Sequence, residues 1–184
     1  MKKLIVFSMI ALFALTGYEA QAQKQNRNAV PASPRQEKRE VREQRRAEKQ
    51  QEFENYIDSL VTSGRFQFIP RTIQLMPAGA LHLITNPNFN MQYWDGTFDV
   101  FLPYIKGFSV PYRMTVLNYT ISNPEGYLNE QTSEGRTVTF TSSLFSATQY
   151  TFTLEVYTKT GSAVLTIKNP WSDTVQYNGN ISAL

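Results

Sequence analysis

Few side chains in this sequence could carry acid–base or metal chemistry. Its 184 residues contain one histidine, His82, and no cysteine. A zinc site would need three carboxylates beside that single imidazole, which is not the usual ligand set. A serine triad would have to use the same histidine, and no Gly-x-Ser-x-Gly motif is present. The alternation in Leu81-His82-Leu83 instead predicts a solvent-facing strand histidine, with both leucines on the opposite face.

A carboxylate pair is the remaining route to catalysis, because glycoside hydrolysis needs only two Asp or Glu side chains in one cleft. Asp95 belongs to a turn motif and Asp173 lies in a loop, while Asp99 and Glu155 fall on the polar phase of their strands. Exposed carboxylates that serve solubility explain all four. Glycine clusters before a helix, which would bind phosphate, are absent. We therefore expect a non-enzymatic protein without a metal or cofactor.

Aromatic residues are the strongest signal of binding. The chain has 12 Phe, 10 Tyr and 2 Trp, most of them in its C-terminal two thirds. Many must fill the core of a small sheet. Others adjoin turns or loops, where rings beside polar groups can stack on sugars, cap an apolar pocket or simply cover one end of a barrel. The candidate ligand-binding residues are Tyr93, Trp94, Phe101, Tyr104, Tyr112 and Trp171.

The N-terminus has the pattern of a secretory signal peptide over residues 1–22. Lys2 and Lys3 precede an apolar run, and Ala20-Gln21-Ala22 forms a small-x-small cleavage site. An uncleaved anchor is the alternative, but the run is shorter than the roughly 20 residues that span a membrane. No other segment is long enough to span, and without cysteine the new N-terminus cannot carry a lipid. The sequence predicts export to the periplasm, the exterior or the cell surface.

A linker and a charged helix follow the signal. Residues 23–34 are mostly Gln, Asn, Ala, Ser and Pro with little to bury, which indicates a disordered linker. Residues 35–63 lack Pro and Gly and are rich in helix formers, which predicts one helix ending at Ser63-Gly64. Its arginine-rich half could contact anionic lipid or polysaccharide, or could be a solvated spacer. A stripe that can dock on a sheet comprises Phe53, Tyr56, Ile57, Leu60 and Val61.

Charge is concentrated in that helix. Residues 23–64 carry nine Lys or Arg and seven Asp or Glu, whereas residues 65–184 carry seven of each. The C-terminal part is therefore neutral. A neutral domain lacks the electrostatic footprint of a nucleic-acid-binding protein.

From residue 64 to residue 184, apolar residues alternate with a period of two. Turn signals such as Asp95-Gly96, Asn123-Pro124-Glu125-Gly126 and Asn178-Gly179 separate these runs. No helical pattern lies between them, so we expect an antiparallel, mainly β domain. About eight strands would form an up-and-down meander, as a lipocalin-like or half-open barrel. A sandwich is the alternative, and an outer-membrane barrel is disfavoured because many strands are near six residues.

A family resemblance appears at Leu102-Pro103-Tyr104, which is followed by Pro111-Tyr112. With the opening strand Arg65 to Phe68 and the unit from Tyr150 to Ile167, the pattern resembles the bacterial domain-of-unknown-function 4251 family over about residues 50–182. Ile105-Lys106-Gly107 departs from the aromatic-Gly-Arg run common in that family. The resemblance implies an exported protein of Gram-negative bacteria with a lipocalin-like fold, and it implies no catalytic residues.

Two functions from different classes remain. The first is a binding module whose curled sheet holds a small apolar or amphipathic ligand. The second is a structural or assembly protein that contacts an envelope protein or a glycan through an exposed edge or aromatic patch. The first fails if side chains completely fill the barrel interior. A solid core with a contiguous apolar surface patch would favour the second.

Overall fold

The computed structural model describes residues 34–106, 113–144, 148–169 and 174–184. The predicted signal peptide and nearly all of the predicted linker lie outside these residues. Internal contacts divide the chain into two units, residues 1–47 and residues 48–184. Among the described residues, no helix has the length and apolar character needed to cross a bilayer.

The helix α2 (Pro34–Ser63) begins one residue earlier than expected and belongs to both units. Its residues 34–47 are exposed throughout, in agreement with their charged composition. The later turns belong to the β domain, where Ile57 and Val61 are buried. Gly64, in the left-handed region with φ +68°, follows the last turn and donates its N–H to the Val61 carbonyl.

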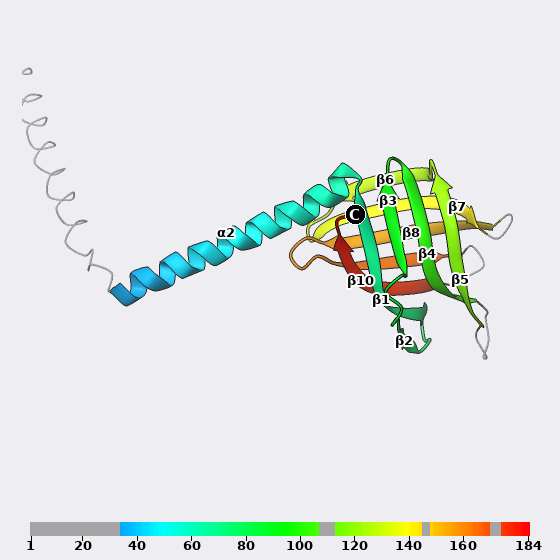
Figure 1. Cartoon of the computed structure of the whole chain (residues 1–184), viewed down its shortest axis with the longest axis horizontal. Helices are drawn as coiled ribbons and strands as arrows, with labels where there is room; N and C mark the ends of the chain where they lie inside the picture. Colours follow the sequence, from blue (N-terminus) through cyan, green and yellow to red (C-terminus); the bar gives the residue numbers. More distant parts are fainter. Residues whose placement is uncertain (1–33, 107–112, 145–147, 170–173) are drawn as a thin grey trace, which may run out of the picture. The chain divides into compact units, whose positions relative to one another are not determined.

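The β domain is one antiparallel sheet that curls into a half-open barrel (Figure 1), which confirms the predicted fold class. Its described residues form ten strands rather than about eight. The strands are β1 (Phe66–Met76), β2 (Leu81–Leu83), β3 (Asn90–Trp94), β4 (Thr97–Lys106), β5 (Arg113–Ser122), β6 (Glu125–Gln131), β7 (Gly135–Leu144), β8 (Thr148–Tyr157), β9 (Ser162–Lys168) and β10 (Thr174–Ser182).

The strand order is β5-β4-β3-β1-β10-β9-β8-β7-β6, with β2 attached to β1. This is an up-and-down barrel whose first and last strands pair, but whose β5 and β6 do not. The turn signal at Asn123-Pro124 therefore lies between β5 and β6, but it does not join two paired strands as a hairpin turn would. Asn123, with φ 52°, donates its N–H to the Gly96 carbonyl and ends the β4–β5 ladder, and Pro124 has no N–H to start another. The seam of the barrel is open at this point.

Two further turn predictions had opposite outcomes. Asp95 and Gly96 have φ 49° and 76° and link β3 to β4 in a two-residue hairpin, as predicted. Asn178-Gly179 is not a turn but the middle of β10, which closes the barrel against β1. The register shifts there, and a Cβ on Gly179 would collide with the carbonyl oxygen of Ile69. The glycine is needed because two strands approach closely at a bulge.

The short strand β2 differs from expectation on one of its two faces. His82 is exposed, as predicted, but Leu81 and Leu83 are also exposed, by 58% and 76%. The strand pairs with β1 alone and lies off the path of the sheet, so neither of its faces meets the core.

Aromatic rings fill the interior of the half-barrel. Phe140 of β7 stacks on Phe98 of β4 with centroids 3.9 Å apart, and on Phe152 of β8 at 4.7 Å. Tyr93 continues this stack beyond Phe98 at 4.2 Å. The rings thus join strands from both halves of the sheet, and no polar or charged residue is buried among the described ones. A ligand inside the barrel would have to displace this stack.

The segment Leu102-Pro103-Tyr104 of β4 also packs in the interior, beyond the aromatic stack. Leu102 and Tyr104 are buried, as expected for a strand that turns these side chains inward. Pro103 does not stop β4, which pairs with β5 as far as Lys106. It lies just past the last residue that β3 pairs, so its missing N–H leaves no gap in that ladder. Its carbonyl accepts a 2.7 Å bond from the buried Tyr177 hydroxyl, and burial raises the pKa of Tyr177 well above its ordinary value.

Candidate functional site

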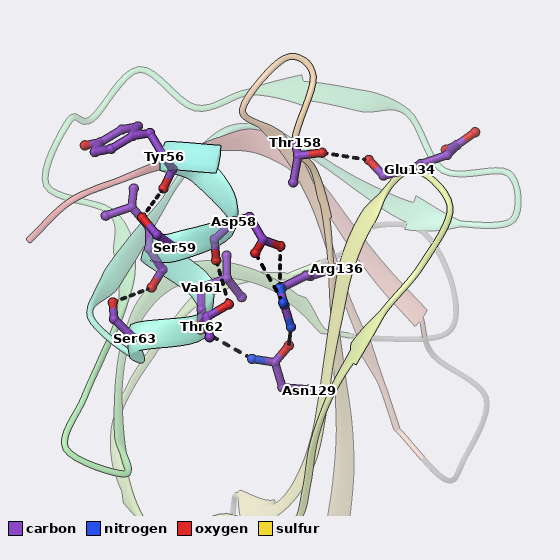
Figure 2. A network of polar contacts seen from close by, with 11 residues as sticks. Tyr56, Asp58, Ser59, Val61, Thr62, Ser63, Asn129, Glu134, Arg136 and Thr158 are labelled. Atoms are coloured by element: carbon purple, nitrogen blue, oxygen red, sulfur yellow. Dashed lines mark hydrogen bonds and ion pairs between the residues drawn. The ribbon is translucent and has the colours of Figure 1, made fainter. Parts of the chain in front are cut away.

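The last turns of α2 are held on the sheet by one charged cluster (Figure 2). The Asp58 carboxylate accepts bonds from Arg136 Nε at 2.6 Å and from Arg136 Nη2 at 3.2 Å. Asn129 accepts from the same guanidinium and donates to the Val61 carbonyl at 3.3 Å. A bidentate pair fixes direction as well as distance. The cluster therefore sets where the helix ends over β6 and β7.

The turn between β8 and β9 provides a second anchor for the helix. Gly161 adopts φ +68°, and a Cβ there would come within 3.2 Å of the Phe53 ring and 3.3 Å of Ile57. The Gln50 amide also donates to the Lys159 carbonyl at 2.9 Å. Of the predicted docking stripe, Ile57, Val61 and partly Leu60 pack on the core, whereas Phe53 and Tyr56 are 39% and 48% exposed.

With the helix held in this way, a cleft opens where α2 ends beside the β3–β4 turn. Its volume is about 470 Å³, within the range of small-molecule sites. The apolar part of its wall comes from Leu60, Trp94 and Leu184, and its charged part from Arg65 and Asp95. No salt bridge between described residues joins these two charged groups. The complete lining is Leu60, Ser63, Arg65, Trp94, Asp95, Ala183 and Leu184.

A second hollow of about 290 Å³ shares Ser63, Arg65 and Asp95 with the first. Its far wall contains Tyr93 and Tyr127, whose rings stack with centroids 5.4 Å apart. Burial, and next the hydrogen bond with Tyr93, raise the pKa of Tyr127 to about 12. The Tyr127 hydroxyl therefore stays protonated at neutral pH and can serve as a hydrogen-bond donor and acceptor.

The chemistry of the cleft is that of recognition. An indole ring and leucine side chains offer contact area to an acyl chain or a ring, and the guanidinium and carboxylate offer directed polar contacts. No group of three or more potential metal ligands occurs among the described residues. We name the cleft and the adjoining hollow the helix-end cleft.

The six predicted site residues are not brought together. Trp94 lines the helix-end cleft, and Tyr93 lines its second hollow while also belonging to the core stack. Phe101 lies on the outer face of β4 against Phe89, with centroids 5.0 Å apart. Tyr104 is buried and meets Tyr150 edge to face. Tyr112 and Trp171 lie outside the described residues.

Sequence reasoning missed Leu60, Arg65 and Leu184 as site residues. Leu60 was assigned only to helix docking, and Arg65 only to the opening strand. Arg65 is the single residue between Gly64, which ends the helix, and β1. It comes close to the Asp95-Gly96 turn only because β3 pairs with β1. No local pattern in the sequence predicts that the end of α2, the β3–β4 turn and the C-terminal residues lie together.

Comparisons with known proteins agree with this fold. The profile of the family described as "Domain of unknown function (DUF4251)" matches residues 48–181. The chain belongs to the DUF4251 family. The match confirms the resemblance seen at Leu102-Pro103-Tyr104, and it starts within α2, at the first residue of the unit that contains the β domain. No curated protein matches this sequence.

A solved DUF4251 structure shows the same fold. It is the crystal structure of a DUF4251 family protein from Bacteroides eggerthii DSM 20697, with a TM-score of 0.54 and 11% identity. The alignment covers 71% of this chain and 87% of that one. At this identity the likeness concerns the fold alone.

Proposed function

We propose that this DUF4251 protein is an exported, non-enzymatic binding module that holds a small amphipathic ligand in the helix-end cleft. The apolar part of the ligand lies on Trp94, Leu60 and Leu184, and its polar part meets Arg65 and Asp95. The observation that carries the proposal is the meeting of half-exposed indole, leucine and charged side chains around one 470 Å³ cleft.

We place the ligand at the surface because side chains fill the interior of the half-barrel. The stack of Tyr93, Phe98, Phe140 and Phe152 occupies the space that a lipocalin-like carrier would keep for its ligand. The cleft, by contrast, needs no core side chain to move. Export itself rests on the signal pattern of residues 1–22, as does placement in the periplasm, outside the cell or on its surface.

The test begins with the full chain exported by a Gram-negative host and purified from the envelope without detergent. Native mass spectrometry of wild type should show a bound small molecule at one per chain. The variant Trp94→Ala should lose it. Phe101→Ala is the matched control, because it removes another partly exposed ring that lies outside the cleft, and it should keep the ligand.

A saccharide is the second candidate, because rings flanked by charged and hydroxyl side chains also stack on sugars. Trp94 with Ser63 and Asp95 offers such a set. Calorimetric titration with dodecanoate and with a neutral oligosaccharide separates the two ligand classes. Binding of neither, together with an empty wild-type protein in native mass spectrometry, would overturn the proposed function.

A further inference from the structure

The strand β5 is one end of the sheet, and its edge is long and carries a charge only at its first residue. Its ten residues read Arg-Met-Thr-Val-Leu-Asn-Tyr-Thr-Ile-Ser, so the only charge lies at its first position. No proline or glycine interrupts it, and its register with β4 has no bulge. Natural sheets protect such edges with lysine, proline, bulges or cover, since an open edge invites another strand to pair.

Hydrogen-bond geometry shows which groups face the open side. Asn123 donates to Gly96 across the β4–β5 ladder, so odd-numbered residues of β5 direct their N–H and C=O toward β4. The even-numbered residues direct theirs away from β4. Their side chains are also exposed, including Met114 at 55% and Val116 at 43%. Among backbone bonds between described residues beyond the ladders, none involves β5.

The other end of the sheet, β6, is protected. Its register with β7 shifts between Glu125 and Leu128, and Gly126 adopts φ +62° within that irregular stretch. Glu125 and Glu130 add two negative charges to a seven-residue strand. A bulged and charged edge resists strand addition. Head-to-tail pairing of β5 on β6 of the next molecule, which would build open fibres, is therefore disfavoured.

We propose that two copies of this chain pair through β5, in antiparallel orientation, across a two-fold axis at Asn118. This register uses the whole strand. It places Val116 of one copy opposite Thr120 of the other, and Met114 opposite Ser122, with Asn118 opposite itself. All of these are even-numbered residues, so each pair can exchange two backbone hydrogen bonds.

A second copy fits this edge because the strand is complementary to itself. No like charges meet in the register, and β-branched Val116 faces β-branched Thr120, a favourable cross-strand pair. Exposed Met114 and Val116 pair with Ile105 and Pro103 on β4, which are themselves buried, so the exposed side chains of the edge border buried apolar residues. An isologous contact closes on itself, so it uses both β5 edges and leaves only the protected β6 edges. The proposal does not depend on the helix-end cleft.

Sedimentation equilibrium of the full chain, exported by a bacterial host, tests the association. We expect a dimer that dissociates on dilution. Val116→Lys places two like charges near the axis and should give a monomer. Leu128→Lys is the matched control, with the same charge change at a side chain of similar exposure, 49% against 43%, on the other edge. It should stay dimeric.

Amide hydrogen exchange measured by NMR tests the register without any variant. In the dimer, the amides of Val116, Asn118 and Thr120 should be protected at high concentration and exchange much faster on dilution. The odd-numbered amides should be protected at every concentration, because they bond to β4. A wild-type monomer up to about 1 mM, a dimer retained by Val116→Lys, or even-numbered amides that exchange equally at all concentrations would each overturn the proposal. Protection only in crude envelope would assign the edge to a different partner and overturn it too.

Discussion

Replacing Phe140 with alanine should destabilise the protein more than any other single ring deletion discussed for this structure. Its side chain is completely buried in β7 and is stacked between Phe98 and Phe152, at 3.9 and 4.7 Å. Phe98 comes from the other half of the sheet. The substitution thus removes the ring that joins the two halves.

The expected loss can be worked out from this burial. Moving a fully buried phenylalanine ring to water costs about 2 kcal/mol. If roughly 80 Å³ of the vacated space stays empty, the cavity adds about 2 kcal/mol at about 24 cal/mol per Å³. The lost stacking adds about 0.5 kcal/mol or more. The free energy of unfolding should fall by about 4 to 5 kcal/mol, which is a large share of the roughly 5–15 kcal/mol typical of a domain.

Urea denaturation followed by far-ultraviolet circular dichroism measures this change. Phe101→Ala is the control, because that ring is only partly buried on the outer face and, among the rings that the structure describes, pairs only with Phe89. We expect a loss of about 1 kcal/mol. A loss at Phe140 no larger than the loss at Phe101 would refute the solid interior. Space for a ligand inside the barrel would then have to be reconsidered.

Three further changes test the helix anchor, the bulge and the partly buried Tyr127. Arg136→Met should lower the free energy of unfolding by about 1–2 kcal/mol, because Asp58, 36% exposed, loses its bidentate partner but keeps some solvent; a double-mutant cycle with Asp58→Asn should give a coupling of about 1 kcal/mol. Gly179→Ala should cost about 2 kcal/mol or more, since its Cβ would meet the Ile69 carbonyl, as urea denaturation would show. The pKa of Tyr127 is about 12 in the folded protein and 10 in the unfolded chain. Its contribution to the free energy of unfolding is therefore complete below pH 10 and is lost as pH rises toward 12. Tyr127→Phe should therefore flatten the fall of stability between pH 10 and 12.

Each of these three predictions has a result that would contradict it. An additive Arg136 and Asp58 cycle would mean that the ion pair does not hold the helix end. An alanine tolerated at 179 would mean that β1 and β10 are farther apart at the bulge. An ultraviolet titration at 295 nm in which Tyr127→Phe removes a phenol of ordinary pKa would contradict the raised pKa of Tyr127 and the partial burial that causes it.

The fold class could be predicted because period-two alternation records which side of each strand faces the core. Phe98, Val100 and Leu102 alternate in the sequence and are buried in the structure. Local turn chemistry was also readable at Asp95-Gly96, where both residues need positive φ. Such signals depend only on a residue and its near neighbours.

Signals that depend on distant partners were misread. Asn178-Gly179 looks like a turn, but the glycine is needed because the backbone of Ile69, more than a hundred residues earlier, approaches it closely. Asn123-Pro124 looks like a hairpin turn, yet it crosses the open seam. Arg65 and Trp94 meet only because β3 pairs with β1, and no short motif shows that pairing. Aromatic type alone could not separate Tyr104, which is core, from Trp94, which lines the cleft.

The most direct test of the central claim, that ligand binds at the helix-end cleft and not inside the barrel, is a methyl NMR titration of the wild-type protein with dodecanoate. The account predicts shifts at the methyl groups of Leu60 and Leu184 and at the Trp94 indole N–H. The methyl groups of Leu154 and Leu165, buried in the core, should remain unchanged. Shifts at Leu154 and Leu165 with an unaffected cleft would contradict it.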